Sequence, residues 1–346
     1  MHLFGQSAAE QVFLDSLASG RLHHGWLITG PEGVGKATLA YRIARTLLAL
    51  RPGDVPPQTL DMSPDATVFR HVASLGEPRL QVCRRPWDDK RKTLKAGITV
   101  DEVRKLKGFF NLSAADGGWR VAIIDAADEM NVSAANALLK ILEEPPANAA
   151  LLLVAHQPGR LLPTIRSRCR TLTCSNLSDN DLGLALDGAG MALPADMTAL
   201  SQLSGGSAGA ALQLVQAEGE ELYSEIVAAL SSLPRLDRGL VLGFADQSTG
   251  RDAAKRYHLI VNLVLLALNR LAKGGATGMA PPEAARGEGD LIHRLAPDAA
   301  CGRAWADLAQ MLASRTAHAI AVNLDPGNVI LDMFLNIEKT AARRAA

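Results

Sequence analysis

The residues best suited to chemistry form the glycine-rich segment GPEGVGKAT, which runs from Gly30 to Thr38. At Gly30, Gly33 and Gly35 the backbone N–H groups can curl around phosphate oxygens at the start of a helix. Lys36 can then reach the β- and γ-phosphates of a nucleotide. An apolar run precedes the segment and a helical pattern follows it, which is the context that this motif requires. The sequence therefore predicts a nucleotide-binding loop between a strand and a helix.

Hydrolysis of a nucleotide also needs a magnesium ligand on the loop and a group that orients the attacking water. Ala37 stands where the motif has a serine or threonine, and Thr38 follows where helical geometry turns its side chain by about 100°. A second apolar run ends at Asp125, but Ala126 follows it where an active ATPase of this type has a glutamate. Asp128 could approach a metal through water, although a structural loop carboxylate is the preferred interpretation. Weak binding of ATP or ADP with magnesium through Thr38 and Asp125 is compatible with these residues, whereas hydrolysis is not expected.

Apolar runs and helical patterns alternate along the first half of the chain. The apolar runs predict strands, and helical spacing predicts helices between them. The predicted strands are 26–29, 119–124 and 149–154, and the predicted helices are 38–50, 99–110 and 133–144. This alternation predicts an α/β fold with a parallel sheet covered on both faces and a site at the carboxyl ends of the strands. Segment 51–97 is rich in proline, glycine and charge, so it predicts a loop-like insertion apart from a short strand at 66–72.

Beyond residue 175, helical patterns rich in alanine and leucine continue without strand-like alternation. A glycine- and proline-rich stretch at 274–289 interrupts them, and we expect it to be flexible. We predict three domains: an α/β nucleotide-binding domain at 1–175, a small helical unit at 176–222 and a larger helical domain at 223–346. The most apolar stretch begins at Leu259 and is too short for a membrane span, so it predicts a buried helix.

Composition excludes several classes of protein. The 346 residues are 48% hydrophobic and 21% charged with a formal net charge of zero, which suits a globular protein without a global attraction to nucleic acid. The four cysteines are scattered, so we expect reduced thiols and no zinc or other metal site. The N-terminal residues lack the pattern of a secretory signal. We therefore expect a cytoplasmic protein without a membrane partner.

Five segments together resemble the clamp-loader branch of the AAA+ ATPases. They are LFGQ (3–6), GRLHHGWLITGPEGVGKATLA (20–40), ITVDEVRKL (98–106), IIDAADEMNVSAANALLKILEEPP (123–146) and LLPTIRSRCR (161–170). The combination of NALLKILEEPP with a later SRC is highly specific to this family, whereas the second half of the chain is similar in helical character alone. The resemblance implies a RecA-like P-loop domain, a helical lid and an all-helical collar through which five subunits assemble.

The resemblance also implies a function in DNA replication. Clamp loaders use ATP to open a ring-shaped sliding clamp and to close it around primer–template DNA. The implied partners are ATPase subunits of the gamma/tau type, a delta-type subunit, the sliding clamp and, through the complex, primed DNA. Many relatives carry a four-cysteine zinc module after the loop, but only Cys83 lies in that region here, so we expect no zinc.

Three alanines distinguish two functions within this resemblance. Ala37, Ala126 and Ala210 each replace a group that hydrolysis would use, the last at the sensor-2 position of the turn at 206–210. We therefore expect a non-hydrolysing stator subunit of a hetero-oligomer, without polymerase activity and with little or no ATPase of its own. The alternative is a catalytically active AAA+ ATPase of DNA metabolism, either a motor-type clamp-loader subunit or a remodeller.

Arg168, in the SRC sequence, is the remaining candidate for catalysis. The resemblance implies that it reaches ATP on a neighbouring subunit as an arginine finger in trans. Without the family context, an arginine between Arg166 and Arg170 would be a surface residue paired with a local carboxylate. The basic run between Arg84 and Lys95 could contact DNA phosphates, but a solvated loop is the preferred interpretation because two aspartates dilute its charge.

Overall fold

The structure is a computed structural model of the chain and describes residues 2–90, 92–111, 117–194, 197–248 and 253–345. Its contacts divide it into two compact units, one of residues 1–189 with 207–209 and the other of residues 190–206 with 210–346. The segment expected to form a separate small helical unit, 176–222, is shared between the two. The three-domain division therefore stays a prediction.

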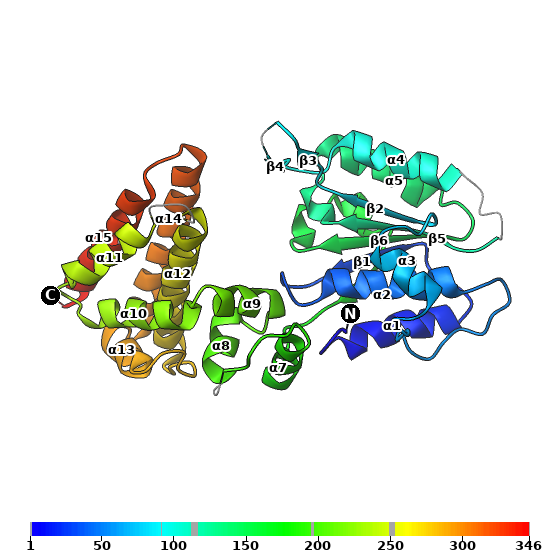
Figure 1. Cartoon of the computed structure of the whole chain (residues 1–346). Coiled ribbons are helices and arrows are strands. Elements are labelled where there is room, and N and C mark those ends of the chain that lie inside the picture. The colour runs from blue at the N-terminus through cyan, green and yellow to red at the C-terminus, as the bar shows by residue number, and fades with distance from the viewer. Residues whose placement is uncertain (1, 91, 112–116, 195–196, 249–252, 346) are drawn as a thin grey trace. The chain divides into compact units, whose positions relative to one another are not determined.

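The first unit is built around a five-stranded sheet with the order β2-β5-β6-β1-β7 (Figure 1). Each neighbouring pair of strands is parallel. The strands are β1 (Gly25–Thr29), β2 (Leu80–Arg84), β5 (Arg120–Asp125), β6 (Ala149–Ala155) and β7 (Arg170–Thr173). The predicted parallel α/β fold is confirmed, and the three predicted strands correspond to β1, β5 and β6.

Helices cover both faces of this sheet. Alternation along β1 places Trp26 and Ile28 in the core on one face and Leu27 in the core on the other. The first core is completed by α1 (Ser7–Ala18), α2 (Lys36–Ala49) and α3 (Thr67–Ala73), and the second by α4 (Val100–Asn111), α5 (Val132–Glu143) and α6 (Pro163–Arg166). Figure 1 shows α1, α2 and α3 on one side of the sheet and α4 and α5 on the other. Because both faces are covered, the central strand β6 is buried along its whole length, which explains its continuous apolar sequence.

Segment 51–97 differs most from the prediction. The short strand expected at 66–72 is wrong, because most of this stretch forms helix α3, whose Val72 lies in the same core as α2. Strand β2 was not predicted, and it extends the sheet by pairing with β5. Two short strands, β3 (Trp87–Asp88) and β4 (Thr93–Leu94), form a separate antiparallel pair. The insertion therefore supplies both a covering helix and an edge of the sheet.

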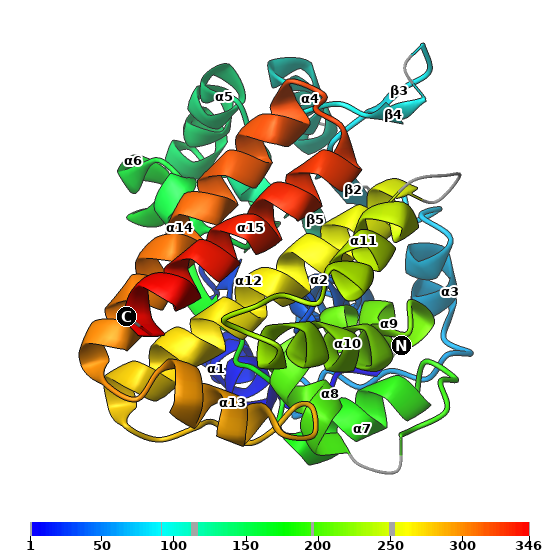
Figure 2. The same cartoon turned by 90° about the vertical axis from the view of Figure 1, so that its left-hand side faces the viewer.

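Helices make up the regular structure of the second unit (Figure 2). They include α8 (Met197–Ser204), α10 (Gly219–Ser231), α11 (Arg238–Gln247), α12 (Ala253–Thr277), α13 (Glu288–Leu295), α14 (Ala299–Ala321) and α15 (Pro326–Ala345). Helix α7 (Asp179–Asp187) belongs to the first unit, and α9 (Ala208–Gln216) begins in the turn that returns to it. Over the described residues beyond 175 the structure has no strand, as the sequence predicts.

The stretch at 274–289, which the sequence predicts to be flexible, is helical at both ends. Gly274 and Gly275 lie inside α12, and a Cβ atom on Gly275 would lie 2.8 Å from the Cα of Gly302 in α14. Gly275 is needed because the backbones of two helices approach each other closely, whereas a Cβ atom on Gly274 would lie 2.3 Å from the Ile292 side chain in α13. Only the part of the stretch after α12 runs as a loop into α13.

Helix α12 is the buried helix that the sequence predicts. Its part Ala254–Thr277 is long and apolar enough to cross a membrane by length and composition alone. In the structure, however, Ile260, Val264 and Leu268 are fully buried in the protein. The apolar character of α12 is thus explained by its position in the core of the second unit.

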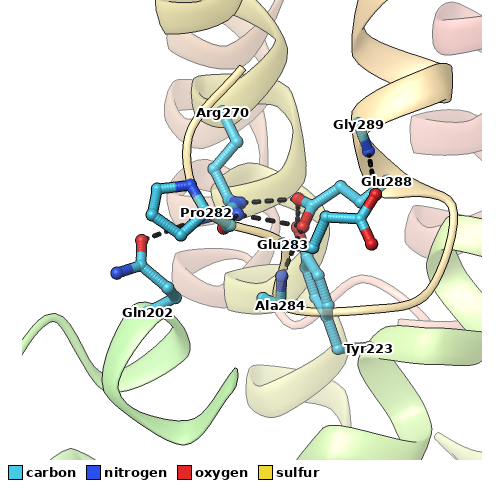
Figure 3. A network of polar contacts seen from close by, with 8 residues as sticks. All are labelled: Gln202, Tyr223, Arg270, Pro282, Glu283, Ala284, Glu288 and Gly289. Atoms are coloured by element: carbon cyan, nitrogen blue, oxygen red, sulfur yellow. Dashed lines mark hydrogen bonds and ion pairs between the residues drawn. The ribbon is translucent and has the colours of Figure 1, made fainter. Parts of the chain in front are cut away.

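A buried polar network joins four parts of this unit (Figure 3). Arg270 of α12 donates from Nε to Oε1 of Glu288 at 2.5 Å and from Nη2 to Oε2 at 2.9 Å. The Tyr223 hydroxyl donates to Oε1 at 2.5 Å, and the Ala284 N–H donates to Oε2 at 2.8 Å. The side chains of Arg270 and Glu288 are only 7% and 3% exposed. Two donors on each carboxylate oxygen offset the cost of burying this ion pair.

Candidate nucleotide-binding site

The glycine-rich segment lies between β1 and α2, as predicted. Gly30, Gly33 and Gly35 have φ angles of 139°, 76° and 101°, which favour glycine. A Cβ atom on Gly30 would lie 2.3 Å from the carbonyl oxygen of Cys174, and one on Gly33 would lie 2.4 Å from Oγ of Ser207. The fold of the loop itself therefore requires these glycines.

Lys36 is the first residue of α2 and is 3% exposed. Its Nζ donates to the carbonyl of Gly30 at 2.7 Å and also to the carbonyl of Pro31. Burial lowers the pKa of Lys36, and negative groups nearby, including Asp125, act in the opposite direction. To reach the phosphates of a nucleotide, the ammonium group would exchange these two carbonyls for phosphate oxygens.

Asp125 is the last residue of β5 and is half-buried. Burial raises the pKa of its carboxyl group, while the positive groups of His156, Lys36 and Arg84 act in the opposite direction. The structure thus brings Asp125 and Lys36 into electrostatic reach of each other at the carboxyl edge of the sheet. Thr38 lies in the first turn of α2 and is also half-buried.

Asp128 is a structural carboxylate in a short turn after β5. Its two oxygens accept hydrogen bonds from the backbone N–H groups of His156 at 3.1 Å and Gln157 at 2.9 Å, just beyond β6. The interpretation of Asp128 as a loop carboxylate is therefore confirmed. Ala37 and Ala126 carry no oxygen on their side chains, so the residues of this site suit phosphate groups better than a catalytic magnesium ion.

The sequence did not reveal the residues that hydrogen-bond to the backbone of the loop from other parts of the chain. Gln6 is 3% exposed, donates from Nε2 to the carbonyls of Val34 at 3.1 Å and Ser175 at 2.8 Å, and accepts from the Ser175 N–H at 3.0 Å. Only its place in the LFGQ segment pointed to it. These bonds connect the loop with the end of β7.

A second contact comes from Ser207, just before α9, and from Gly209 in the first turn of α9. Ser207 Oγ donates to the carbonyl of Glu32 at 2.8 Å, and the Gly209 N–H donates to the carbonyl of Gly33 at 3.0 Å. The glycine and serine residues at 204–209 predict a turn, but they do not indicate that the turn contacts the glycine-rich loop. These two bonds fix the loop through the carbonyl groups of Glu32 and Gly33.

Arg168 lies near the amino ends of the sheet strands, whereas the loop lies at their carboxyl ends. Its backbone carbonyl is close to Gly25, which begins β1, whereas the loop begins after β1 ends. The distance along the strand from Gly25 to Gly30 is roughly 16 Å, which is more than an arginine side chain can span. The structure therefore does not bring Arg168 together with Lys36 or Asp125 of the same chain.

The Arg168 side chain contacts a local carboxylate. Its Nη2 lies 3.0 Å from Oε1 of Glu143, and its Nη1 donates to the carbonyl of Thr164 at 3.1 Å. Glu143 is the last residue of α5, which begins after the capping side chain of Asn131 and ends before two prolines. Both partners are partly exposed, at 38% and 48% of their side-chain surfaces.

The other candidates contribute less to this site. In the basic run, Arg85 Nε lies 2.9 Å from Oε2 of Glu129, while Arg91 lies outside the described residues. Cys83 and Cys174 are buried, and burial raises the pKa of each thiol. Among the described residues, no group of three or more His, Cys, Asp or Glu side chains could hold a metal ion.

Comparisons with known proteins identify the family. A family model described as "DNA polymerase III, delta subunit" matches residues 5–178. The DNA polymerase III subunit delta' of Pseudomonas aeruginosa is 40% identical over 151 residues, which are 44% of this chain and 43% of that protein. In this match the chain therefore spans less than half of its relative.

Two further relatives are similar over longer stretches. The DNA polymerase III subunit delta' of Escherichia coli K12 is 29% identical over 330 residues, which cover 93% of this chain and 91% of that protein. The subunit delta' of Yersinia pestis is 31% identical over 257 residues, 72% of each chain. The matched region of the family model contains the glycine-rich loop, Asp125 and Arg168. This chain belongs to the DNA polymerase III subunit delta' family.

Proposed function

We propose that this chain is a non-hydrolysing stator subunit of a replicative clamp loader. It assembles in the cytoplasm with ATPase subunits of the gamma/tau type and a delta subunit, and the complex places a sliding clamp on primed DNA. Family membership supports the general role. The residues around Lys36 support the absence of hydrolysis, and the position of Arg168 supports the proposed finger.

The observation that carries the stator proposal is the chemistry around Lys36. The loop retains the glycines and the lysine that suit phosphates, but Ala37 and Ala126 supply neither a magnesium ligand nor a group to orient water. The nearby carboxylate of Asp128 is engaged with two backbone N–H groups. Nucleotide binding without turnover is therefore the expected behaviour of this site.

Turnover of ATP by the isolated full-length chain tests this proposal. We expect no magnesium-dependent hydrolysis above background, and no change on substituting Lys36→Ala. The alternative, an active ATPase of DNA metabolism, requires turnover that Lys36→Ala abolishes. Bound nucleotide alone does not distinguish the two functions, because the loop can hold phosphates without hydrolysing them.

The arginine finger is the second part of the proposal. Arg168 lies too far from the loop of its own chain to act there, yet it lies partly exposed at the sheet edge. A guanidinium group can stabilise the charge that develops on the γ-phosphoryl oxygens of ATP held by a neighbouring subunit. Fingers of this kind increase the rate by about 10³–10⁵ in other systems.

Two substitutions at Arg168 test the finger in the reconstituted loader. Arg168→Ala should leave assembly intact and lower the ATPase activity that DNA and clamp stimulate. The decrease should be smaller than the rate effects of fingers in other systems, because other subunits also contribute to turnover. Arg168→Lys should rescue poorly, since lysine lacks the planar fork of donors. Arg166→Ala is the matched control, because Arg166 is an exposed arginine two residues away. Wild-type loading by the Arg168→Ala complex would show that Arg168 is only a surface residue.

Assembly is assigned to the helical region from about residue 223. Its long helices α12, α14 and α15 belong to one helical unit, and helical bundles of this kind can join subunits through their outer faces. A chain truncated before this region should no longer enter the complex, as size-exclusion chromatography with the other subunits would show. Assembly of the truncated chain with normal affinity would rule this assignment out.

A further inference from the structure

Helix α2 carries two buried arginines three residues apart, Arg42 and Arg45, which are 5% and 4% exposed. Arg42 is neutralised by two carboxylates, with Nε 2.6 Å from Oε1 of Glu10 and Nη2 2.8 Å from Oδ1 of Asp61. Arg45 has no such partner: within the described part of the chain no carboxylate forms an ion pair with it, and its buried Nε has no hydrogen-bond acceptor. On adjacent turns, one helix thus carries a guanidinium paired with carboxylates and a second one whose buried Nε has no acceptor.

Among the described residues, an aromatic ring is the close partner of the Arg45 guanidinium. Its Cζ lies 4.3 Å from the ring centroid of Phe69 in α3. A cation–π contact attracts the charge, but it does not accept the in-plane N–H groups. Burial, together with the like charge of Arg42, lowers the pKa of Arg45, yet a guanidinium stays protonated in proteins. A buried charge without an acceptor costs free energy of folding.

Arg45 stands where two hollows meet. One has a volume of about 390 Å³, and its lining is mixed, with His2, Asp61 and Ser63 beside the apolar Met62 and Pro64. The other has a volume of about 340 Å³, and its lining includes Tyr41, Val72 and Leu75. Arg45 and Phe69 line both hollows. The guanidinium therefore lies between a hollow of mixed lining and a mainly apolar one, within the first unit.

We propose that this α2/α3 site binds a peptide segment that presents a carboxylate to Arg45 and an adjacent apolar side chain to the hollow of Tyr41, Val72 and Leu75. The planar fork of a guanidinium matches a carboxylate with two parallel hydrogen bonds. Leu75 is 51% exposed, so part of the apolar hollow is open to a partner. The site is separate from the nucleotide loop and does not depend on the proposed clamp-loader function.

The surrounding charges favour a carboxylate over a phosphate. Asp61 lines the hollow of mixed lining with a side chain that is 73% exposed, and it repels a dianion more strongly than a single carboxylate. An inorganic phosphate would also leave the apolar hollow empty. Because Nε of Arg45 is already shielded from solvent in the folded chain, a ligand that pairs with the guanidinium removes less water than it would at an exposed arginine.

Stability gives the first test, in the full-length chain. Arg45→Met keeps the length of the side chain over Phe69 but removes the unpaired charge, so the midpoint of thermal unfolding should rise. Arg42→Met is the matched control on the same helix, and its midpoint should fall because Glu10 and Asp61 lose their partner. A lower midpoint for Arg45→Met than for the wild type would show that the guanidinium is satisfied in the native protein, and would overturn the proposal.

Ligand binding gives the second test, with N-acetylphenylalanine as the probe. It should shift the NMR signals of the Leu75 methyl groups and of the Arg45 Nε–H group in a saturable manner. N-acetylphenylalaninamide, which lacks the carboxylate, should bind at least tenfold more weakly, and Arg45→Met should abolish the shifts. Equal binding of the amide, retained binding by Arg45→Met, or a response to inorganic phosphate without a response to N-acetylphenylalanine would each overturn the assignment of the ligand.

Discussion

The guanidinium of Arg168 and the carboxylate of Glu143 form an ion pair of 3.0 Å at the sheet edge opposite the glycine-rich loop. Both side chains are partly exposed, so water and salt screen their attraction. Ion pairs of this kind contribute about 0–1 kcal/mol to stability. The arginine can therefore leave Glu143 for a more negative partner at little cost, which is what the proposed action in trans requires.

Glu143→Gln should separate the ion pair from the proposed finger. We expect its free energy of unfolding to change by less than about 1 kcal/mol. We also expect the reconstituted loader to keep its wild-type ATPase or to exceed it, because the guanidinium no longer has a competing carboxylate. Urea denaturation and the ATPase assay measure the two effects. A loss of ATPase as large as that of Arg168→Ala would mean that the pair itself is needed.

Gly30→Ala should destabilise the first unit, because the added Cβ would lie 2.3 Å from the Cys174 carbonyl oxygen and φ is 139°. A strained residue of this kind costs about 1–3 kcal/mol. Gly108→Ala in α4 is the control: its Cβ meets nothing within 4 Å, so helix propensity should stabilise it by up to about 1 kcal/mol. Urea denaturation followed by tryptophan fluorescence compares the two, and equal stabilities would contradict the geometry of the loop.

The stability contributed by Asp125 should depend on pH. Because burial raises its pKa in the folded state above the ordinary value of 3.8, the folded chain binds the proton more tightly than the unfolded chain. Stability is therefore lost as the pH rises from about this ordinary value through the raised pKa. Asp125→Asn should raise the thermal midpoint at pH 7, and the gain should vanish below the ordinary value.

Asp128→Asn provides the contrast to Asp125→Asn. The two Asp128 oxygens accept backbone N–H groups, and an amide can offer only one acceptor oxygen. This substitution should lower stability at pH 7 by about 1–3 kcal/mol. If both substitutions shifted the midpoint in the same direction, the assigned roles of the two carboxylates would be wrong.

The network of Arg270, Glu288 and Tyr223 should behave as a coupled unit (Figure 3). Arg270→Met leaves the Glu288 carboxylate buried without its counter-charge and should cost about 3–5 kcal/mol. The double substitution Arg270→Met with Glu288→Met should recover only part of this loss, because no unpaired charge remains but the Tyr223 hydroxyl and the Ala284 N–H lose their acceptor. Additive losses in a double-mutant cycle would show that the two charges do not interact.

The central part of the fold could be predicted because its signals are local. A buried parallel strand such as β6 is apolar along its whole length, and α5 has helix formers that end at two prolines. Edge strands give weaker signals. Strands β2 and β7 mix apolar with polar or charged residues and are recognised only through their partners β5 and β1. Helix α3 was predicted as a strand because valine and phenylalanine suggest one, but packing against α2 determines its conformation.

The site could be predicted in part for the same reason. The loop glycines, Lys36 and Asp125 lie in a motif with fixed spacing, so sequence indicates them directly. Gln6 and Ser207 act on the loop from 28 and 175 residues away, measured to their partners Val34 and Glu32, and no local pattern indicates such contacts. Arg45 looks like any other helical arginine in the sequence. Only the arrangement of carboxylates around α2 distinguishes it from Arg42.

The hydrogen bond from Ser207 to the carbonyl of Glu32 in the loop has a consequence for synthesis on the ribosome. At roughly 5–20 residues per second, the 175 residues that separate Glu32 from Ser207 take about 9–35 s to translate. All five strands precede residue 174, so the nascent sheet can form while the carbonyl groups of Glu32 and Gly33 still lack their native partners. Ribosome-bound chains stalled before residue 207 should therefore be cleaved in the loop by added protease, and protection should begin once residue 209 has emerged.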